Sequence, residues 1–318
     1  MSNLDELATL EDAQFHHVSV LPQETIAALN LQPGGHYLDA TLGGGGHSRL
    51  MLEADPTIRL VGLDQDDAAL AAAQANLAEF GDRVTIERTN FSQFKPMKRR
   101  FDGILADLGV SSAQLDIADR GFSFRQDAAL DMRMDQRQET TAAIVVNTWD
   151  ESELADAIYT YGEERLSRRI ARAIVAARPL QTTKQLADVI WQVSPNAYRH
   201  GRIHPATRTF QALRIVVNQE LAVLERLIAR APKWLNPGGR LVLISFHSLE
   251  DRIVKHQLRE HELLKVLTKK PVIPTEAECA VNPRARSAKL RVAERVAIES
   301  GKSTGFPNAT SEGCATLE

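Results

Sequence analysis

Three aspartates lie at or near the ends of apolar runs that predict β-strands. Asp64 ends the run 58–64, and Asp39 and Asp107 occupy similar places in two other strand-like runs. In a doubly wound sheet, ligands bind outside the carboxyl ends of the strands, so these carboxylates are expected to meet at one edge. Carboxylates placed there can accept hydrogen bonds from the two hydroxyls of a ribose. The alternative is that all three only cap strands of an ordinary α/β domain.

Four glycines and a histidine, residues 43–47, follow the strand-like run that contains Asp39. A helical pattern comes after them, from Ser48. Without a Cβ the backbone can approach a ligand closely, and the start of the helix offers free N–H groups. The dinucleotide fingerprint G-x-G-x-x-G does not fit, since Gly43 and Gly45 match but Ser48 stands at the third glycine. Asp39 before the loop and N–H groups within it suit the methionine end of S-adenosylmethionine. That cofactor is predicted, and a nicotinamide-dependent oxidoreductase is the alternative enzyme class.

Eight longer segments extend the signal well beyond the cofactor loop. They are His47–Leu50, Asp107–Ser112, Arg120–Phe124, Leu130–Asp135, Tyr161–Arg165, His204–Arg214, Ser245–Arg252 and Asn282–Ser287. On these segments the chain resembles the bacterial RsmH (MraW) family, from about residue 15 to about residue 298. Two positions depart from the family pattern: Gly44, where Arg is common, and Ala113, where Pro is common.

The resemblance implies an S-adenosylmethionine-dependent methyltransferase that acts on a cytosine 4-amino group of 16S rRNA, in the decoding region of the small ribosomal subunit. It also implies a set of cofactor-binding residues: Gly45, Gly46 and His47 at the methionine end, Asp64 at the ribose, Phe91 at the adenine, and Asp107 and Gln114 completing the pocket. An RNA-binding assembly factor with a vestigial cofactor fold is the non-enzymatic alternative.

Asp107 is the predicted catalytic residue. Methyltransferases of exocyclic amines place an acidic or amide side chain at the end of the fourth strand, where it orients the amine. These enzymes usually continue Pro-Pro-aromatic, whereas this chain continues Leu108-Gly109-Val110, so a ring that stacks on the base must come from elsewhere. Phe122 and Phe124 are the candidates. Their alternative role is simple packing in the core of a helical insertion.

The charge distribution favours an RNA partner even though the net charge is −3. From Tyr161 to Arg214 the chain has ten Lys or Arg against three Asp or Glu, and a local basic field can bind phosphates. The predicted RNA-binding residues are His204, Arg208, Arg214, His247, Arg252, Arg284 and Arg286. Two structural alternatives stand beside this prediction. The arginines can form a solvated helix face, and Ser248 can cap a helix with Asp251 three residues on.

The order of elements predicts an α/β fold: a Rossmann-like class I methyltransferase sheet with an inserted helical domain. Strand-like runs fall at about 36–42, 58–64, 84–89, 101–108 and 240–246, with helical patterns between them. About 130 residues of mostly helical pattern separate the fourth run from the fifth, more than one crossover needs. The predicted organisation is a discontinuous cofactor domain (15–113 and 209–298), a substrate-recognition insertion (114–208) and a disordered tail (299–318).

The return to the sheet is expected as one long helix from Thr209 to Leu235, followed by an antiparallel closing pair near Leu264–Ile273 and Ala288–Val296. Hydrophobic residues make up 43% of the chain without a membrane-length run, which is typical of a globular protein. Cys279 and Cys314 are expected to be reduced thiols in a cytoplasmic protein. No metal site is predicted, and a homo-oligomer is left open.

Overall fold

A seven-stranded sheet forms the centre of the protein. The computed structural model of the 318-residue chain describes residues 19–110, 114 and 118–297. The strands lie in the order β3 (Val84–Arg88), β2 (Arg59–Asp64), β1 (His36–Asp39), β4 (Phe101–Asp107), β5 (Leu235–Ser245), β7 (Lys289–Arg295) and β6 (Leu264–Val266). The first five are parallel, and β7 runs antiparallel to both of its neighbours. This topology confirms the predicted Rossmann-like class I methyltransferase sheet and its antiparallel closing pair.

Helices cover both faces of the sheet, as a parallel sheet requires. One face packs against α1 (Pro22–Leu29), α2 (Gly46–Ala54) and α3 (Asp67–Leu77), and the other against α11 (Glu220–Arg230) and α12 (Ser248–Glu260). Successive side chains of a strand point to opposite faces. Accordingly, Tyr37 belongs to the first core and its neighbour Leu38 to the second. The short elements η1 (Ala78–Arg83), η3 (Ala231–Lys233), α13 (Glu276–Val281) and η4 (Pro283–Ser287) complete this region.

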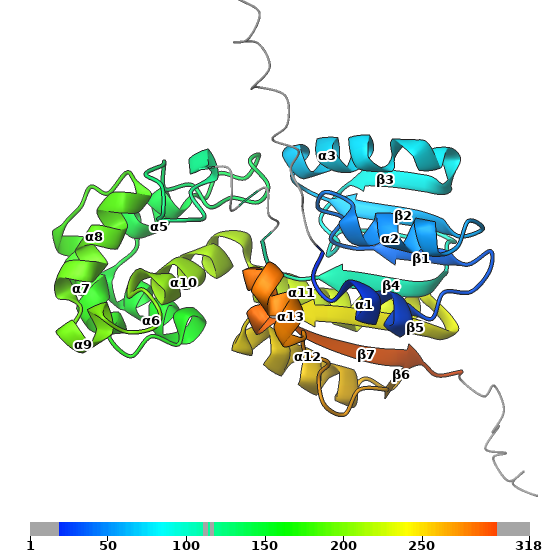
Figure 1. Ribbon diagram of the computed structural model, residues 1–318. Coiled ribbons are helices and arrows are strands. Elements are labelled where there is room, and N and C mark those ends of the chain that lie inside the picture. Colours follow the sequence, from blue (N-terminus) through cyan, green and yellow to red (C-terminus); the bar gives the residue numbers. More distant parts are fainter. Residues whose placement is uncertain (1–18, 111–113, 115–117, 298–318) are drawn as a thin grey trace, which may run out of the picture.

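A helical region lies beside the sheet, at the end where the parallel strands terminate (Figure 1). It contains η2 (Ala118–Arg120), α5 (Ala142–Thr148), α6 (Glu151–Gly162), α7 (Ser167–Ala176), α8 (Thr183–Val193), α9 (Asn196–Arg199) and α10 (Ala206–Asn218). These helices bury an apolar cluster of their own, with Leu154, Ile170, Ile190 and Leu213 among the side chains that are at most 1% exposed. The insertion therefore has an independent core.

The expected long helix from Thr209 to Leu235 is wrong, because two helices replace it. The chain breaks at Gln219, whose φ of 51° lies in the left-handed region and ends α10. Leu213 of α10 packs in the helical core, whereas Leu227 of α11 packs on the sheet. By packing, the helical region thus reaches Gln219 instead of ending at residue 208. The sequence does not indicate this break, because apolar residues keep the same helical spacing on both sides of Gln219.

Smaller differences concern element ends. β1 already ends at Asp39, β5 begins at Leu235 rather than near residue 240, and β6 covers only Leu264–Val266 of the expected run. The tail predicted for 299–318 lies outside the described residues, as do Ala113 and Cys314. In the described part of the chain, no helix is long and apolar enough to cross a lipid bilayer.

Candidate active site

One cavity opens at the carboxyl ends of the parallel strands, where the three aspartates were expected to meet. Asp39, Asp64 and Asp107 end β1, β2 and β4, which are adjacent in the sheet. Asp64 and Asp107 line the cavity, and Asp39 lies buried behind the glycine loop. The fold thus collects at one edge three carboxyl groups that are separated by up to 68 positions in the sequence.

The glycine loop has the backbone that its sequence suggests. Gly43 and Gly45 have positive φ values of 53° and 82°, a region that glycine occupies without strain. Gly45 is the N-cap of α2, and a Cβ there would lie 3.0 Å from Leu77 Cδ1. The Gly43 N–H donates to Asp64 Oδ2 at 2.8 Å, so the carboxylate of β2 holds the loop in place. Gly46 and His47 follow and line the cavity.

Asp64 is also held by the backbone that follows it. Its Oδ1 accepts the N–H groups of Gln65 at 2.8 Å and Asp66 at 2.9 Å. Burial nevertheless raises the pKa of Asp64 to about 6, against the opposing effect of these donors. Asp64 Oδ2 accepts one N–H, against two at Oδ1, so it retains capacity for a hydroxyl donor of the kind that the ribose prediction requires.

His47 is a neutral imidazole in this environment. Burial lowers the pKa of His47 to about 4, and its Nε2 lies 2.8 Å from the carbonyl oxygen of Val20. The carbonyl accepts only from a protonated nitrogen, so Nε2 carries the hydrogen and Nδ1 presents a lone pair. That lone pair faces Asp107 Oδ2 at 3.6 Å. His47 therefore supplies no positive charge that would favour an ionised Asp107.

Asp107 is correspondingly hard to ionise. Burial, with the nearby charges of Asp39 and Glu250, holds the pKa of the Asp107 carboxyl well above its usual range. Its Oδ1 is buried and has no hydrogen-bond partner among the described residues. A buried polar atom normally has a partner, so an unpartnered oxygen at a cavity wall suits a group that arrives with a ligand. A donor such as an amine meets that need.

Gln114 connects this site to the helical region. Its Nε2 donates to Asp66 Oδ2 at 3.0 Å, and Arg120 Nη1 lies 2.7 Å from the same oxygen. Asp66 is 3% exposed and also caps α3. Sequence reasoning missed Asp66 and Arg120, although Arg120 opens one of the segments that resemble the family. No local pattern predicts a pair 54 positions apart.

Among the described residues, the phenylalanine rings that line the cavity are not the two that were expected to stack on the target base. Phe122 is 8% exposed and belongs to the helical core, and Phe124 packs against that core with its ring 4.9 Å from Phe210. Phe91 and Phe246 line the cavity instead. Packing, the alternative role for Phe122 and Phe124, is the one that the structure favours.

The seven residues predicted to bind RNA do not form one surface. Arg214 and Arg284 line the cavity, and Arg214 is paired with Glu220 through Nε at 2.7 Å and Nη2 at 2.8 Å. Arg286 is exposed on η4. His204 lies in the helical region with its ring 5.3 Å from that of Trp191. The pairing leaves Arg214 unsuited to a phosphate contact.

Arg208 and Arg252 lie where the two regions meet. Arg208 Nη1 lies 3.8 Å from Glu164, and Arg252 Nη2 lies 3.0 Å from Glu163 Oε1. Ser248, at the start of α12, also donates to Glu163. The Arg252 and Ser248 contacts hold the helical region against α12, whereas the Arg208 contact lies within the helical region, between α10 and the end of α6.

His247, not Ser248, caps α12. Its ring accepts the Glu250 N–H, and the Glu250 side chain accepts the His247 N–H at 3.2 Å, which makes a reciprocal capping box. The predicted capping motif is therefore shifted by one residue, with Glu250 in the place expected for Asp251. Asp251 instead lies 2.6 Å from Arg291 of β7.

The fold also assembles a cluster that the spacing did not suggest. Ligand atoms of Glu220, His247 and Glu250 lie within 4.8 Å of one another, a geometry that could hold a metal ion. Both oxygens of Glu220 already accept from Arg214. The Arg214 guanidinium thus occupies the position that a metal ion would take beside Glu220. Burial favours the neutral form of Glu250, but its hydrogen bond to His247 and the charge of Arg214 outweigh burial and lower the Glu250 pKa.

A sheet of this topology, with a glycine loop after β1 and carboxyl groups at the ends of β1, β2 and β4, is that of an S-adenosylmethionine-dependent class I methyltransferase. The chain matches the MraW methylase family over residues 14–296, and it belongs to that family.

Similar proteins cover nearly the whole chain. It is 62% identical over 289 residues to "Ribosomal RNA small subunit methyltransferase H" of Trichormus variabilis, which covers 91% of this chain and 95% of that protein. The protein of the same name in Synechococcus elongatus is 60% identical over 290 residues, covering 91% and 98%. Among solved structures, an rRNA methylase from Streptococcus thermophilus aligns with a TM-score of 0.42 at 9% identity, over 86% of this chain and 95% of that one.

Proposed function

We propose that the protein transfers a methyl group from S-adenosylmethionine to the 4-amino group of a cytosine in 16S rRNA, within the decoding region of the small ribosomal subunit. The single observation that carries this proposal is membership of the MraW methylase family across residues 14–296. The relatives' names support a small-subunit rRNA substrate. The position and base are those that the resemblance of the sequence segments implies. Such a reaction takes place in the cytoplasm, where the subunits are assembled.

The cavity supports this chemistry from its own residues. Bound S-adenosylmethionine supplies an activated methyl group, so the protein mainly has to align donor and acceptor. Gly45, Gly46 and His47 would hold the methionine end and Asp64 the ribose, with Phe91 beside the adenine. Each except Gly45 lines the cavity. Gly45 would act indirectly, because it is the N-cap residue at which α2 begins.

Asp107 and Gln114 would complete the pocket on the side of the reaction. The N4 lone pair of cytosine is delocalised into the ring, so the amine needs acceptors that orient it. The unpartnered Oδ1 of Asp107 can accept one amine hydrogen. As the new N–C bond forms and the C–S bond breaks, the amine must lose one proton. Asp107, once ionised beside the cationic donor, can accept it.

RNA affinity is proposed to come from arginines other than those first predicted. Arg165, just before α7, and Arg168 and Arg169, in its first turn, are exposed and have no ion pair or hydrogen bond within the part of the chain that the structure describes. The opposite face of α7 is buried through Ile170 and Ile174. Free guanidinium groups at the N-terminal end of one helix suit an RNA backbone better than the paired Arg208 and Arg214.

Methyl transfer to the intact subunit tests the proposal. Small subunits that lack the modification are incubated with labelled S-adenosylmethionine, and the rRNA is digested and analysed for N4-methylcytidine. Asp107→Ala should lower turnover far more than the affinity for subunits, since a group that aligns the transition state affects the rate constant. Label on another nucleoside, or none with a folded and cofactor-binding protein, would refute the proposal. Gel filtration with light scattering decides whether the chain forms a homo-oligomer.

A further inference from the structure

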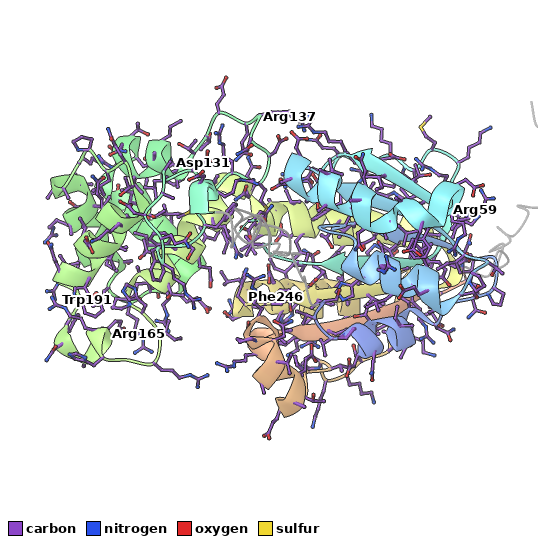
Figure 2. The ribbon with its side chains drawn as sticks, turned by 45° about the horizontal axis from the view of Figure 1, so that its top comes forward. Arg59, Asp131, Arg137, Arg165, Trp191 and Phe246 are labelled. Carbon is purple, nitrogen blue, oxygen red and sulfur yellow. The ribbon has the colours of Figure 1, made fainter. Side chains whose placement is uncertain are left out.

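We propose that Phe246 is the aromatic platform on which the target base stacks, and that the cavity at the ends of β4 and β5 is the subsite for that base. This inference rests on the proposed RNA methylation and adds the residue that positions the base. Phe246 directly follows the last residue of β5 and lines the cavity. Figure 2 shows Phe246 where the helical region meets the sheet, and Arg59, which begins β2, near the opposite end of the sheet.

The strand order separates the two rings of the cavity. Phe91 follows the end of β3 and Phe246 the end of β5, with β2, β1 and β4 between those strands. Adjacent strands lie about 4.8 Å apart, so the two strand ends are separated by roughly 19 Å. At that distance, one small planar group cannot contact both rings at once. Each ring must therefore serve a different part of the bound molecules.

The ribose-side carboxylate assigns the two ends of the cavity. Asp64 ends β2, next to β3, so the adenosine portion belongs on the Phe91 side. The glycine loop follows β1, which places the methionine portion at the middle of the sheet. Asp107 ends β4, on the other side of β1. A nucleophile that attacks in line from beyond the methionine portion comes from the β5 side, where Phe246 lies.

Phe246 is held firmly enough to act as a platform. Its backbone N–H donates to Glu250 Oε2 at 2.8 Å, and the Glu250 side chain is only 3% exposed. The ring is partly buried and packs against the same apolar cluster as Phe80. One part of the ring is thus fixed by the core while another part remains free at the cavity. Ordering such a ring costs little entropy when a base binds.

The end of β4 passes close beside this ring. A Cβ on Gly109 would lie 3.6 Å from Phe246 Cδ2, and Gly109 has a positive φ of 96°. Asp107 is only two residues earlier in the chain. A pyrimidine stacked on Phe246 would therefore bring its exocyclic amine to the Asp107 carboxyl. Stacking does not discriminate between bases, so the ring would only position the cytosine. Discrimination against other bases would come from hydrogen bonds to polar groups such as Asp107.

Replacement of the ring tests the platform. Phe246→Leu keeps apolar packing but removes the π face, and Phe246→Tyr keeps both. We expect the Leu variant to lower kcat/KM for unmethylated small subunits by about 10-fold or more, the range of one base–aromatic stack. The Tyr variant should stay within about threefold of the wild type. Cofactor affinity, measured calorimetrically with S-adenosylmethionine alone, should remain within about twofold in both.

Phe80→Leu is the matched control, since Phe80 is a partly buried ring on the same cluster and does not line the cavity. It should leave kcat/KM unchanged. The platform is refuted if Phe246→Leu keeps wild-type kcat/KM, if Leu and Tyr lose equally, or if the Phe80 control loses as much. Phe246→Met, which keeps more apolar volume, replaces the Leu variant if that one unfolds. A wild type that methylates no cytosine refutes the proposed function instead.

Discussion

The carboxyl groups around the cavity differ in their readiness to ionise, although they lie close together. Burial raises the pKa of Asp39 and of Asp64 to about 6, and burial together with the charges of Asp39 and Glu250 holds the pKa of Asp107 well above its usual value. Glu250, just as buried, has a lowered pKa because His247 and Arg214 compensate its charge. Groups of one chemical kind whose environments separate their pKa values mark a site built for proton and charge handling.

Asp64 offers the most direct test of the cofactor assignment. Asp64→Ala should weaken S-adenosylmethionine binding by about 1–3 kcal/mol, since charge-assisted hydrogen bonds have that magnitude. The same change removes the acceptor of the Gly43 N–H and so loosens the glycine loop. Calorimetric titration of the folded variant measures the effect. Asp67→Ala is the control, because Asp67 is exposed and its carboxylate pairs with Arg88. Equal affinity in both variants would disprove the ribose role.

The raised pKa of Asp39 makes stability depend on pH. The folded state holds this proton more tightly than the unfolded chain, whose carboxyl has its ordinary pKa, so this contribution is present at low pH and lost as pH rises through about 6. Between pH 5 and 7.5 the loss is about 1 kcal/mol. Asp39→Asn removes the titration and can keep the hydrogen bonds to Ser48 and Thr41. Urea unfolding should show that the free energy of unfolding of the variant, relative to that of the wild type, is higher at pH 7.5 than at pH 5. The same difference between the two proteins at both pH values would contradict the raised pKa of Asp39.

At the scale of elements, α7 presents the most strongly divided surface of the helical region. Its buried side carries Ile170, Ala171 and Ile174, and its exposed side carries arginines. Figure 2 places Arg165, just before α7, and Trp191 of α8 in the helical region, away from the sheet. The contact surface proposed for RNA is therefore separate from the cavity. Affinity for the subunit and affinity for the cofactor should vary independently.

Neutralising that face tests the RNA contact. Replacing Arg165, Arg168 and Arg169 together by Gln should weaken binding to small subunits and reduce the slope of log K against log salt by about 2–3. Each lost phosphate contact releases nearly one counterion fewer. Binding of S-adenosylmethionine should not change. Filter binding across a salt series provides the slopes.

The control for this variant removes the same charge from helices on the sheet. Arg226, Lys233 and Lys255 are exposed and, among the described residues, have no ion pair. Their triple replacement by Gln should leave the slope closer to that of the wild type. If both triple variants change the slope equally, the effect is one of net charge, and α7 has no special role.

At the scale of the whole molecule, the helical region is joined to the sheet by polar contacts around the cavity. Arg120 of the helical region places its Nη1 2.7 Å from Oδ2 of Asp66, the residue that caps α3 beside the sheet. Glu163 at the end of α6 contacts Arg252 and Ser248 of α12. Such contacts fix the orientation of one region against the other without a shared apolar core. An RNA held by the helical region would thereby reach Asp107 in one register.

Glu163 tests that coupling. Its ion pair is largely exposed, so Glu163→Gln should lower the free energy of unfolding by less than about 1 kcal/mol. The rate of methyl transfer should nevertheless fall several-fold, because small misplacements of reacting groups are costly. S-adenosylmethionine affinity should stay constant. Glu151→Gln, which loses the exposed pair with Arg172 inside the helical region, is the control. Unchanged rates in both variants would show that the bridge does not orient the regions.

The sequence by itself determined the sheet, the glycine loop and the positions of Asp39, Asp64 and Asp107. These features are local: strand periodicity, glycine in a turn and a carboxylate at a strand end are written in consecutive residues, and parallel strands bring their ends together. The family resemblance added roles for Phe91 and Gln114, which no local pattern carries. It also identified segments such as Asn282–Ser287, without showing what each one contacts.

Only the tertiary structure decided which polar and aromatic side chains meet. Arg214 was predicted to bind RNA, but the turn at Gln219 brings Glu220 against it and pairs the charge. Phe122 and Phe124 pack in or against the helical core, whereas Phe246, which lies in one of the family segments but was given no role there, lines the cavity. The reason is physical: a side chain's spacing along the chain sets its face on an element, whereas its partners depend on how distant elements pack.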